Sequence, residues 1–122
     1  MHPNGETITV GHLPNAHTDG DSYVYFKNAN VIHAGDTFFN GFYPFIDVEH
    51  GGTLRGVIKA ADTLLSLAND STKIIPGHGP PGHGPMGDKA ALLAYRTMLS
   101  QVHGLIADSQ AQRPDGKTGG RF

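Results

Sequence analysis

A helical pattern lies between strand patterns on both sides, and this order limits the possible folds more than any other feature of the sequence. Residues 54–68 place apolar side chains at spacings of three and four, directly after Thr53, a residue type that caps helices. A short branched apolar segment, residues 72–76, follows and is typical of a buried strand. A helix that connects strands predicts a sheet with helices packed against it.

Strand patterns precede this helix in three segments. The segments alternate polar and apolar residues or are rich in β-branched and aromatic side chains. Only a tight turn separates the second segment from the third, so these two are predicted to form an antiparallel hairpin. The third is expected to end at Gly35, and residues 36–52 are expected to form a long aromatic loop. The three segments are residues 7–10, 22–27 and 31–34.

A second helix is predicted after Asp88, where apolar residues again form one stripe. After residue 107 the composition turns polar and rich in glycine, so we expect a domain over residues 1–107 and a flexible tail over residues 108–122. The whole order predicts an α/β (α+β) fold, a mixed sheet with two helices on one face, whose other face needs a cover. The stripe of the second helix consists of Leu92, Tyr95, Leu99, Val102 and Ile106.

Size and composition exclude several classes of protein. The 122 residues are enough for one domain, and 17 glycines with 8 prolines indicate many turns. A net charge of −2 gives no electrostatic basis for binding nucleic acid or an anionic membrane. The chain has no cysteine, which excludes disulfides and thiolate metal sites. No signal peptide and no apolar run of about 20 residues is visible, so we expect a soluble cytoplasmic protein.

Three candidate metal ligands each follow a predicted strand, in segments rich in glycine or aspartate. They are His17, Asp36 and His78. Imidazole and carboxylate groups suit zinc, iron or manganese where thiolates are absent. The three positions are far apart in the sequence, so the fold would have to bring them together. On the residues alone, His17 is also compatible with a hydrogen bond in a polar loop, and Asp36 with a turn.

The segments around these residues resemble the metallo-β-lactamase superfamily, and the resemblance covers roughly residues 6–107. The matching segments are residues 16–22, 31–36 and 75–80. The resemblance implies that His17 binds one metal, that Asp36 bridges two metals, and that His78 binds the second. It also implies that a metal-activated water attacks an ester, thioester, lactone or lactam, with one or two zinc ions or with iron or manganese.

The resemblance is to the C-terminal half of the family's fold only. The family's His-x-His-x-Asp-His motif is absent, and so is the N-terminal half of its αββα sandwich. What remains implies half of such a sandwich, in which His17, Asp36 and His78 form one three-ligand site with an open position for water. The uncovered face of the sheet is expected to pack against a second copy in a homodimer or against a missing N-terminal half.

Four aromatic residues after the third strand have two interpretations. They wall an apolar pocket for a small-molecule substrate beside the metal, or they fill the edge of the core that the missing half leaves. The four residues are Phe38, Phe39, Phe42 and Tyr43.

The remaining histidines carry no ligand motif. His33 lies in a predicted strand and is expected to face the core or a neighbour, whereas His83, in a second Gly-His-Gly-Pro sequence, is expected in a surface loop. Asp19 and Asp21 are expected to accept hydrogen bonds from the backbone of their loop, unless Asp21 orients His17. Exposed positions are expected for His2, His12, His50 and His103.

Three hypotheses for function remain open from the sequence. The first is a metal-dependent hydrolase that is incomplete as a single chain. The second is a non-catalytic half-domain for metal binding or assembly, which needs only a partner surface. The third is a fragment of a longer hydrolase. The absent histidine motif counts against the first, and the retained ligand set is unnecessary for a purely structural module.

Overall fold

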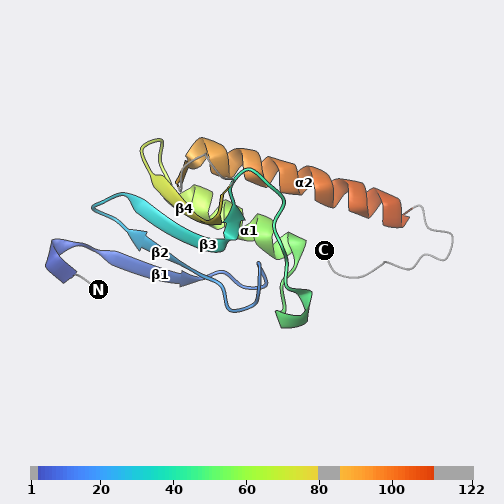
Figure 1. Cartoon of the computed structure of the whole chain (residues 1–122), viewed down its shortest axis with the longest axis horizontal. Helices are drawn as coiled ribbons and strands as arrows, with labels where there is room; N and C mark the ends of the chain where they lie inside the picture. The colour runs from blue at the N-terminus through green and yellow to red at the C-terminus, as the bar shows by residue number, and fades with distance from the viewer. Residues whose placement is uncertain (1–2, 80–85, 112–122) are drawn as a thin grey trace.

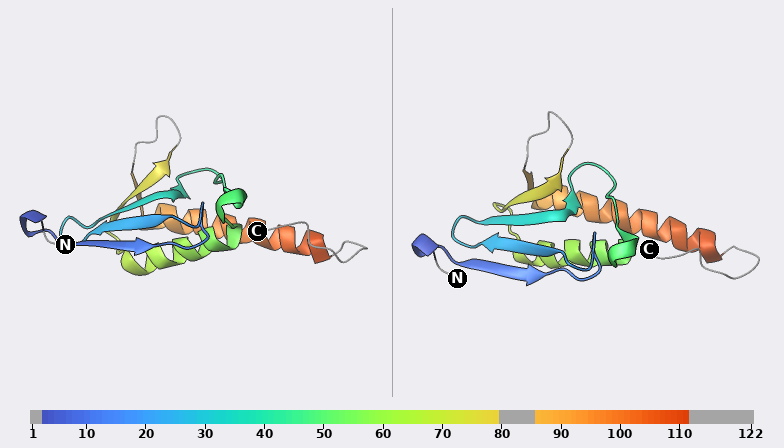
Figure 2. Two further views of the ribbon diagram at one scale, coloured as in Figure 1. Left: turned by 90° about the horizontal axis from the view of Figure 1, so that it is seen from below. Right: turned by 60° about the horizontal axis from the view of Figure 1, so that its bottom comes forward.

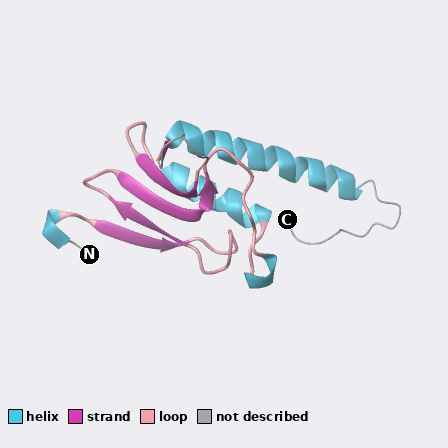
Figure 3. Ribbon diagram, in the orientation of Figure 1, coloured by secondary structure: helices cyan, strands magenta, loops and turns pink. Residues whose placement is uncertain are grey.

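The computed structural model describes residues 3–79 and 86–111, and it contains one five-stranded sheet with two helices on one face (Figure 1). Figure 3 shows the same arrangement coloured by type of element. The mixed sheet with two helices confirms the predicted fold class. The elements are η1 (Pro3–Gly5), β1 (Ile8–His12), β2 (Ser22–Phe26), β3 (Val31–Phe39), η2 (Val48–His50), α1 (Leu54–Leu67), β4 (Lys73–His78), β5 (Gly87–Asp88) and α2 (Lys89–Ala111).

The sheet joins an antiparallel hairpin to a parallel crossover. Its strands lie in the order β1-β2-β3-β4-β5, and all neighbours are antiparallel except β3 and β4. A parallel pair needs a long crossover connection, and α1 lies in this one. The carboxyl ends of β3 and β4 therefore meet at the same edge of the sheet. The sequence did not predict β5, because two residues cannot show an alternating pattern.

Strand β3 continues past Gly35, which corrects the prediction that it ends there. It runs from Val31 to Phe39, so Phe38 and Phe39 belong to the strand and not to the aromatic loop. The pairing of β3 with β4 shifts register on both sides of Gly35, whose φ of +59° is left-handed. This irregularity breaks the alternation of side chains, and for this reason the sequence pattern stops early.

Both helices begin at the residues expected to cap them. The Thr53 hydroxyl accepts a hydrogen bond from the Gly56 backbone N–H at 2.9 Å. The Asp88 carboxylate accepts one from the Ala91 backbone N–H at 2.8 Å. In the described part of the chain, no helix has the length and apolar character needed to span a membrane. The core between helices and sheet includes Ile32, Phe38, Leu54, Val57, Leu64, Ile74, Leu92 and Leu99.

One face of the sheet carries no helix, as the two views of Figure 2 show. Residues directly opposite each other on neighbouring strands share a face. The row of Tyr25, Ile32 and Ile74 packs in the core on the helix side. The alternate rows form the surface that we call the open face, and it consists of Ile8, Val10, Val24, Phe26, Val31, His33, Lys73 and Ile75.

His33 lies on this open face and is exposed, which corrects the expectation that it packs against the core or a neighbour. Its Nδ1 accepts a hydrogen bond from the Gly35 backbone N–H at 3.1 Å. Val10, on the edge strand, is 61% exposed. The open face is therefore mostly apolar, and neither of the two described helices covers it.

Candidate metal centre

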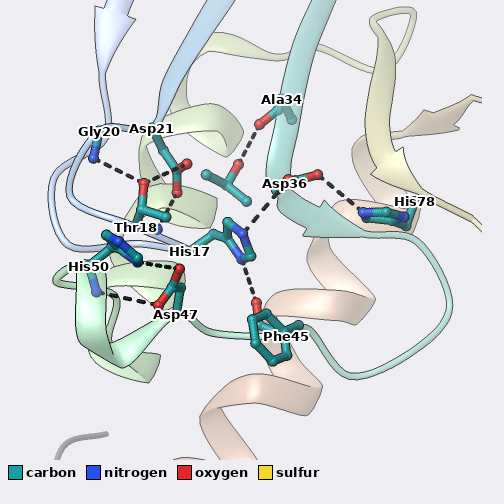
Figure 4. A network of polar contacts seen from close by, with 11 residues as sticks. His17, Thr18, Gly20, Asp21, Ala34, Asp36, Phe45, Asp47, His50 and His78 are labelled. Atoms are coloured by element: carbon teal, nitrogen blue, oxygen red, sulfur yellow. Dashed lines mark hydrogen bonds and ion pairs between the residues drawn. The ribbon is translucent and has the colours of Figure 1, made fainter.

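The loop between β1 and β2 carries His17 and is held by the carboxylates expected to shape it. The Asp21 carboxylate accepts hydrogen bonds from the Thr18 backbone N–H at 2.9 Å and from the Thr18 hydroxyl at 3.2 Å. The Asp19 carboxylate accepts one from the Asn15 N–H at 3.3 Å. Both aspartates thus stabilise the loop, as expected, and Figure 4 shows Asp21 turned toward Thr18.

A backbone carbonyl fixes the orientation of the His17 ring. The ring's Nδ1 lies 2.5 Å from the carbonyl oxygen of Phe45. Because a carbonyl oxygen can only accept, Nδ1 carries the proton, and in the neutral ring Nε2 keeps its lone pair. That Nε2 lies 3.7 Å from Oδ2 of Asp36. The Nε2 lone pair of His17 therefore faces the Asp36 carboxylate. Both groups are acceptors, and two acceptors that face each other can share a cation.

Asp36 lies between two imidazole rings, as Figure 4 shows. Its Oδ2 faces His17, and its Oδ1 lies 3.3 Å from Nε2 of His78, the last residue of β4. The His17 side chain is 17% exposed, whereas those of Asp36 and His78 are 43% and 55% exposed. The fold therefore brings the three sequence-predicted residues together, and their cluster opens to solvent on the side of His78.

The aromatic ring of Phe39 lies beside the rings of both His17 and His78. It stacks on His78 with ring centroids 4.7 Å apart and planes at 24°, and its centroid is 6.2 Å from that of His17. Phe45 lies on another side of His17, with centroids 5.9 Å apart. These ring contacts restrict the orientations of both imidazoles.

The arrangement differs from the expected single three-ligand site. Among the described residues, no group of three histidine, aspartate or glutamate side chains is arranged to hold one metal ion. Each histidine instead faces a different oxygen of Asp36. A carboxylate that presents one oxygen to each of two imidazoles has the donor geometry of a bridging ligand. The three residues therefore form two histidine–carboxylate pairs that share Asp36, and not a closed three-ligand site.

The other histidines lie outside this cluster. His12, at the end of β1, and His50, at the end of η2, are exposed, as expected, and each contacts a residue close to it in the sequence. The His12 Nε2 lies 2.5 Å from the Asp19 carbonyl oxygen, and the His50 Nδ1 lies 2.7 Å from the Asp47 carboxylate. His103 is half-buried in α2, which corrects the expected exposure. The expectations for His2 and His83 fall outside the described residues.

A pocket of about 570 Å³ lies between the loop after β3 and helix α2. Of the aromatic residues expected to wall a substrate pocket, Phe42 and Tyr43 line this space. Phe38 is fully buried and packs on Tyr95 with ring centroids 5.2 Å apart, so it is part of the core. The sequence did not reveal the contribution of α2. The lining is Asn40, Gly41, Phe42, Tyr43, Ala91, Ala94, Tyr95, Met98 and Val102.

Comparisons with known proteins agree with this fold. The model of the metallo-beta-lactamase superfamily matches residues 3–88. No sequence among curated proteins matches the chain. A metallo-beta-lactamase from Pontibacter korlensis is 18% identical, with a TM-score of 0.65 over 82% of this chain and 44% of that one. DIM-1 metallo-beta-lactamase is 19% identical, with a TM-score of 0.62 over the same shares.

A third similar structure is that of TTHA1623, determined in a di-iron-bound form. It is 26% identical, with a TM-score of 0.54 over 69% of this chain and 38% of that one. The chain thus spans less than half the length of each of these three structures. The first two likenesses, at under 25% identity, show the fold alone.

Proposed function

Because this chain belongs to the metallo-beta-lactamase superfamily, we propose that it supplies part of the metal centre of a hydrolase, with His17, Asp36 and His78 as ligands. The observation that carries the proposal is the Asp36 carboxylate, which faces a different histidine with each oxygen. The donor set suits one or two zinc ions, and iron or manganese as alternatives. The di-iron form of TTHA1623 supports iron as one alternative.

A bound metal would lower the pKa of a water molecule and supply hydroxide for attack on an ester, thioester, lactone or lactam. The chain's own residues prepare the site for this chemistry. The Phe45 carbonyl holds the proton of His17 at Nδ1 and leaves Nε2 as the donor atom. The Asp36 carboxylate supplies negative charge between the two rings. The exposure of His78 leaves room for a substrate to approach from solvent.

The open face is the reason to propose a partner that completes the fold. It is mostly apolar, and the chain spans only 44% of the first similar structure. We propose that a second sheet covers it, supplied either by a second copy in a homodimer or by an N-terminal half that completes the sandwich. The apolar open face and the short chain also favour a second candidate function, a non-catalytic half-domain that binds metal or assembles with a partner. A fragment of a longer hydrolase would have the same two features.

Zinc titration of the metal-free chain by calorimetry tests the ligand assignment. We expect His78→Ala and Asp36→Asn each to weaken zinc binding by at least about tenfold, because each removes a donor. The matched control is His12→Gln, which changes an exposed histidine outside the cluster and keeps a donor toward the Asp19 carbonyl. Equal zinc affinity in all four proteins would refute the assignment. Chelator-sensitive ester hydrolysis that His78→Ala abolishes would separate the hydrolase from the non-catalytic half-domain.

A further inference from the structure

The pocket between the loop after β3 and α2 has the size and lining of a ligand site. Its volume of about 570 Å³ lies within the range of small-molecule pockets, roughly 300–1,000 Å³. Most of its lining residues are aromatic or aliphatic, Asn40 is the one with an amide side chain, and none carries a charged side chain. Tyr95, one of the lining residues, is neutral near pH 7 as any phenol is, and burial raises its pKa further above the ordinary value of 10.0. The pocket therefore favours an uncharged apolar group.

The pocket lies beside the candidate metal centre. Asn40, at the pocket wall, donates its backbone N–H to the His78 carbonyl oxygen at 2.9 Å. The Phe42 ring, also in the wall, meets Phe39 edge-on with centroids 5.5 Å apart. Phe39 in turn stacks on His78. The Phe39 and Phe42 rings thus lie between the pocket and His78. Because His78 and Phe42 are both exposed to solvent, a molecule held near His78 could pass over the Phe42 ring and place an apolar group in the pocket.

We propose that this pocket binds the aliphatic acyl tail of the substrate, so that the hydrolysed ester or thioester carries a medium-length hydrocarbon chain. This inference rests on the proposed hydrolase function. The open face is a separate surface, because the sheet lies between it and α2 (Figure 2). Small side chains on α2, Ala91 and Ala94, leave the space that the tail occupies. The carboxylate of the product acid would then lie toward the metal centre.

Calorimetric titration of the metal-free chain with decanoate, and with acetate as the tail-free reference, tests the pocket. We expect decanoate to bind at least about tenfold more tightly than acetate, since only its chain reaches the apolar walls. Ala94→Trp should remove most of this difference by filling the pocket, and Ala94→Leu should remove part of it. Both substitutions are at an exposed position. The matched control, Ala90→Trp, changes an exposed residue of α2 outside the pocket and should leave the difference within about twofold.

The outcomes separate this inference from the proposed function. Loss of decanoate binding in Ala94→Trp but not in Ala90→Trp supports the pocket. Decanoate binding no tighter than that of acetate, or equal in the two tryptophan variants, overturns it. Zinc affinity is measured on the same preparations. If the chain binds zinc through His78 but does not bind decanoate, the proposed metal centre stands and the proposed acyl-tail pocket is refuted. If the chain binds decanoate but not zinc, the pocket stands as a fatty-acid site and the proposed hydrolase function is refuted.

Discussion

Gly77 of β4 lies against the carboxylate of Asp36 so closely that a β-carbon at residue 77 would overlap Oδ1 and would lie 2.8 Å from the carbonyl carbon of Gly35. Because Gly77 has no side chain, the carboxylate of Asp36, the candidate bridging ligand, can occupy this position. The contact joins the two parallel strands at the edge where β3 and β4 end. It also explains why a glycine precedes His78 in the strand.

Gly77→Ala is expected to displace the Asp36 carboxylate and weaken zinc binding by about tenfold or more, as disturbing a ligand's position does. Calorimetric zinc titration measures the change. Gly104→Ala is the matched control, since a β-carbon there meets no atom within 4 Å. The control should leave zinc affinity unchanged and stabilise α2 by about 0.5–1 kcal/mol, because alanine favours helix over glycine. Unchanged zinc affinity in both variants would contradict the placement of Asp36.

Thr53→Ala is expected to lower the free energy of unfolding by about 1–2 kcal/mol. The Thr53 hydroxyl caps α1 and also donates to the Asn15 carbonyl at 2.9 Å, so it ties the helix to the His17 loop. Urea denaturation measures the loss. Thr63→Ala serves as the control, because the Thr63 hydroxyl bonds only within α1, to the Lys59 carbonyl at 3.1 Å, and should change stability by less than about 0.5 kcal/mol. An equal decrease in the free energy of unfolding in both variants would show that the Thr53 cap contributes no more to stability than the Thr63 hydroxyl.

Glu6→Gln is expected to lower the melting temperature at neutral pH but not in acid. Burial tends to raise the pKa of Glu6, but three backbone N–H donors, those of Thr7, Asn28 and Ala29, lower it below the ordinary value of 4.5. A lowered pKa in the folded state gives stability that is present above the unfolded value and is lost as the pH falls through the folded value. The difference between the two proteins should therefore shrink below pH 4.5. Glu49→Gln, at an exposed residue of η2, is the control.

Val10→Glu is expected to weaken self-association, because it places a charge on the open face. Sedimentation velocity at micromolar concentration measures the mass. Leu105→Glu, on α2, is the matched control: Leu105 is 70% exposed and Val10 is 61% exposed, but only Val10 lies on the sheet. A dimer that only Val10→Glu dissociates supports a second copy on the open face. A wild-type chain that is monomeric and well folded would exclude that second copy.

The sequence predicted the fold well where local patterns are regular. The caps at Thr53 and Asp88, the hairpin and the crossover helix all follow from short-range patterns, and the structure confirms them. The end of β3 could not be predicted, because the left-handed Gly35 interrupts the alternation. The Phe45 carbonyl that orients His17 could not be predicted either, since every residue has a carbonyl and the contact depends on how the loop folds back.

The parallel pairing of β3 with β4 also determines when the candidate centre can form during folding. The two strands pair only after the whole α1 crossover has closed, which is a contact between distant parts of the chain. Such non-local pairing forms slowly compared with a hairpin such as β2–β3. Asp36 and His78 belong to opposite sides of that pairing. A metal ion that requires both residues would therefore bind only after the slowest part of the sheet has assembled, and it would stabilise the finished sheet selectively.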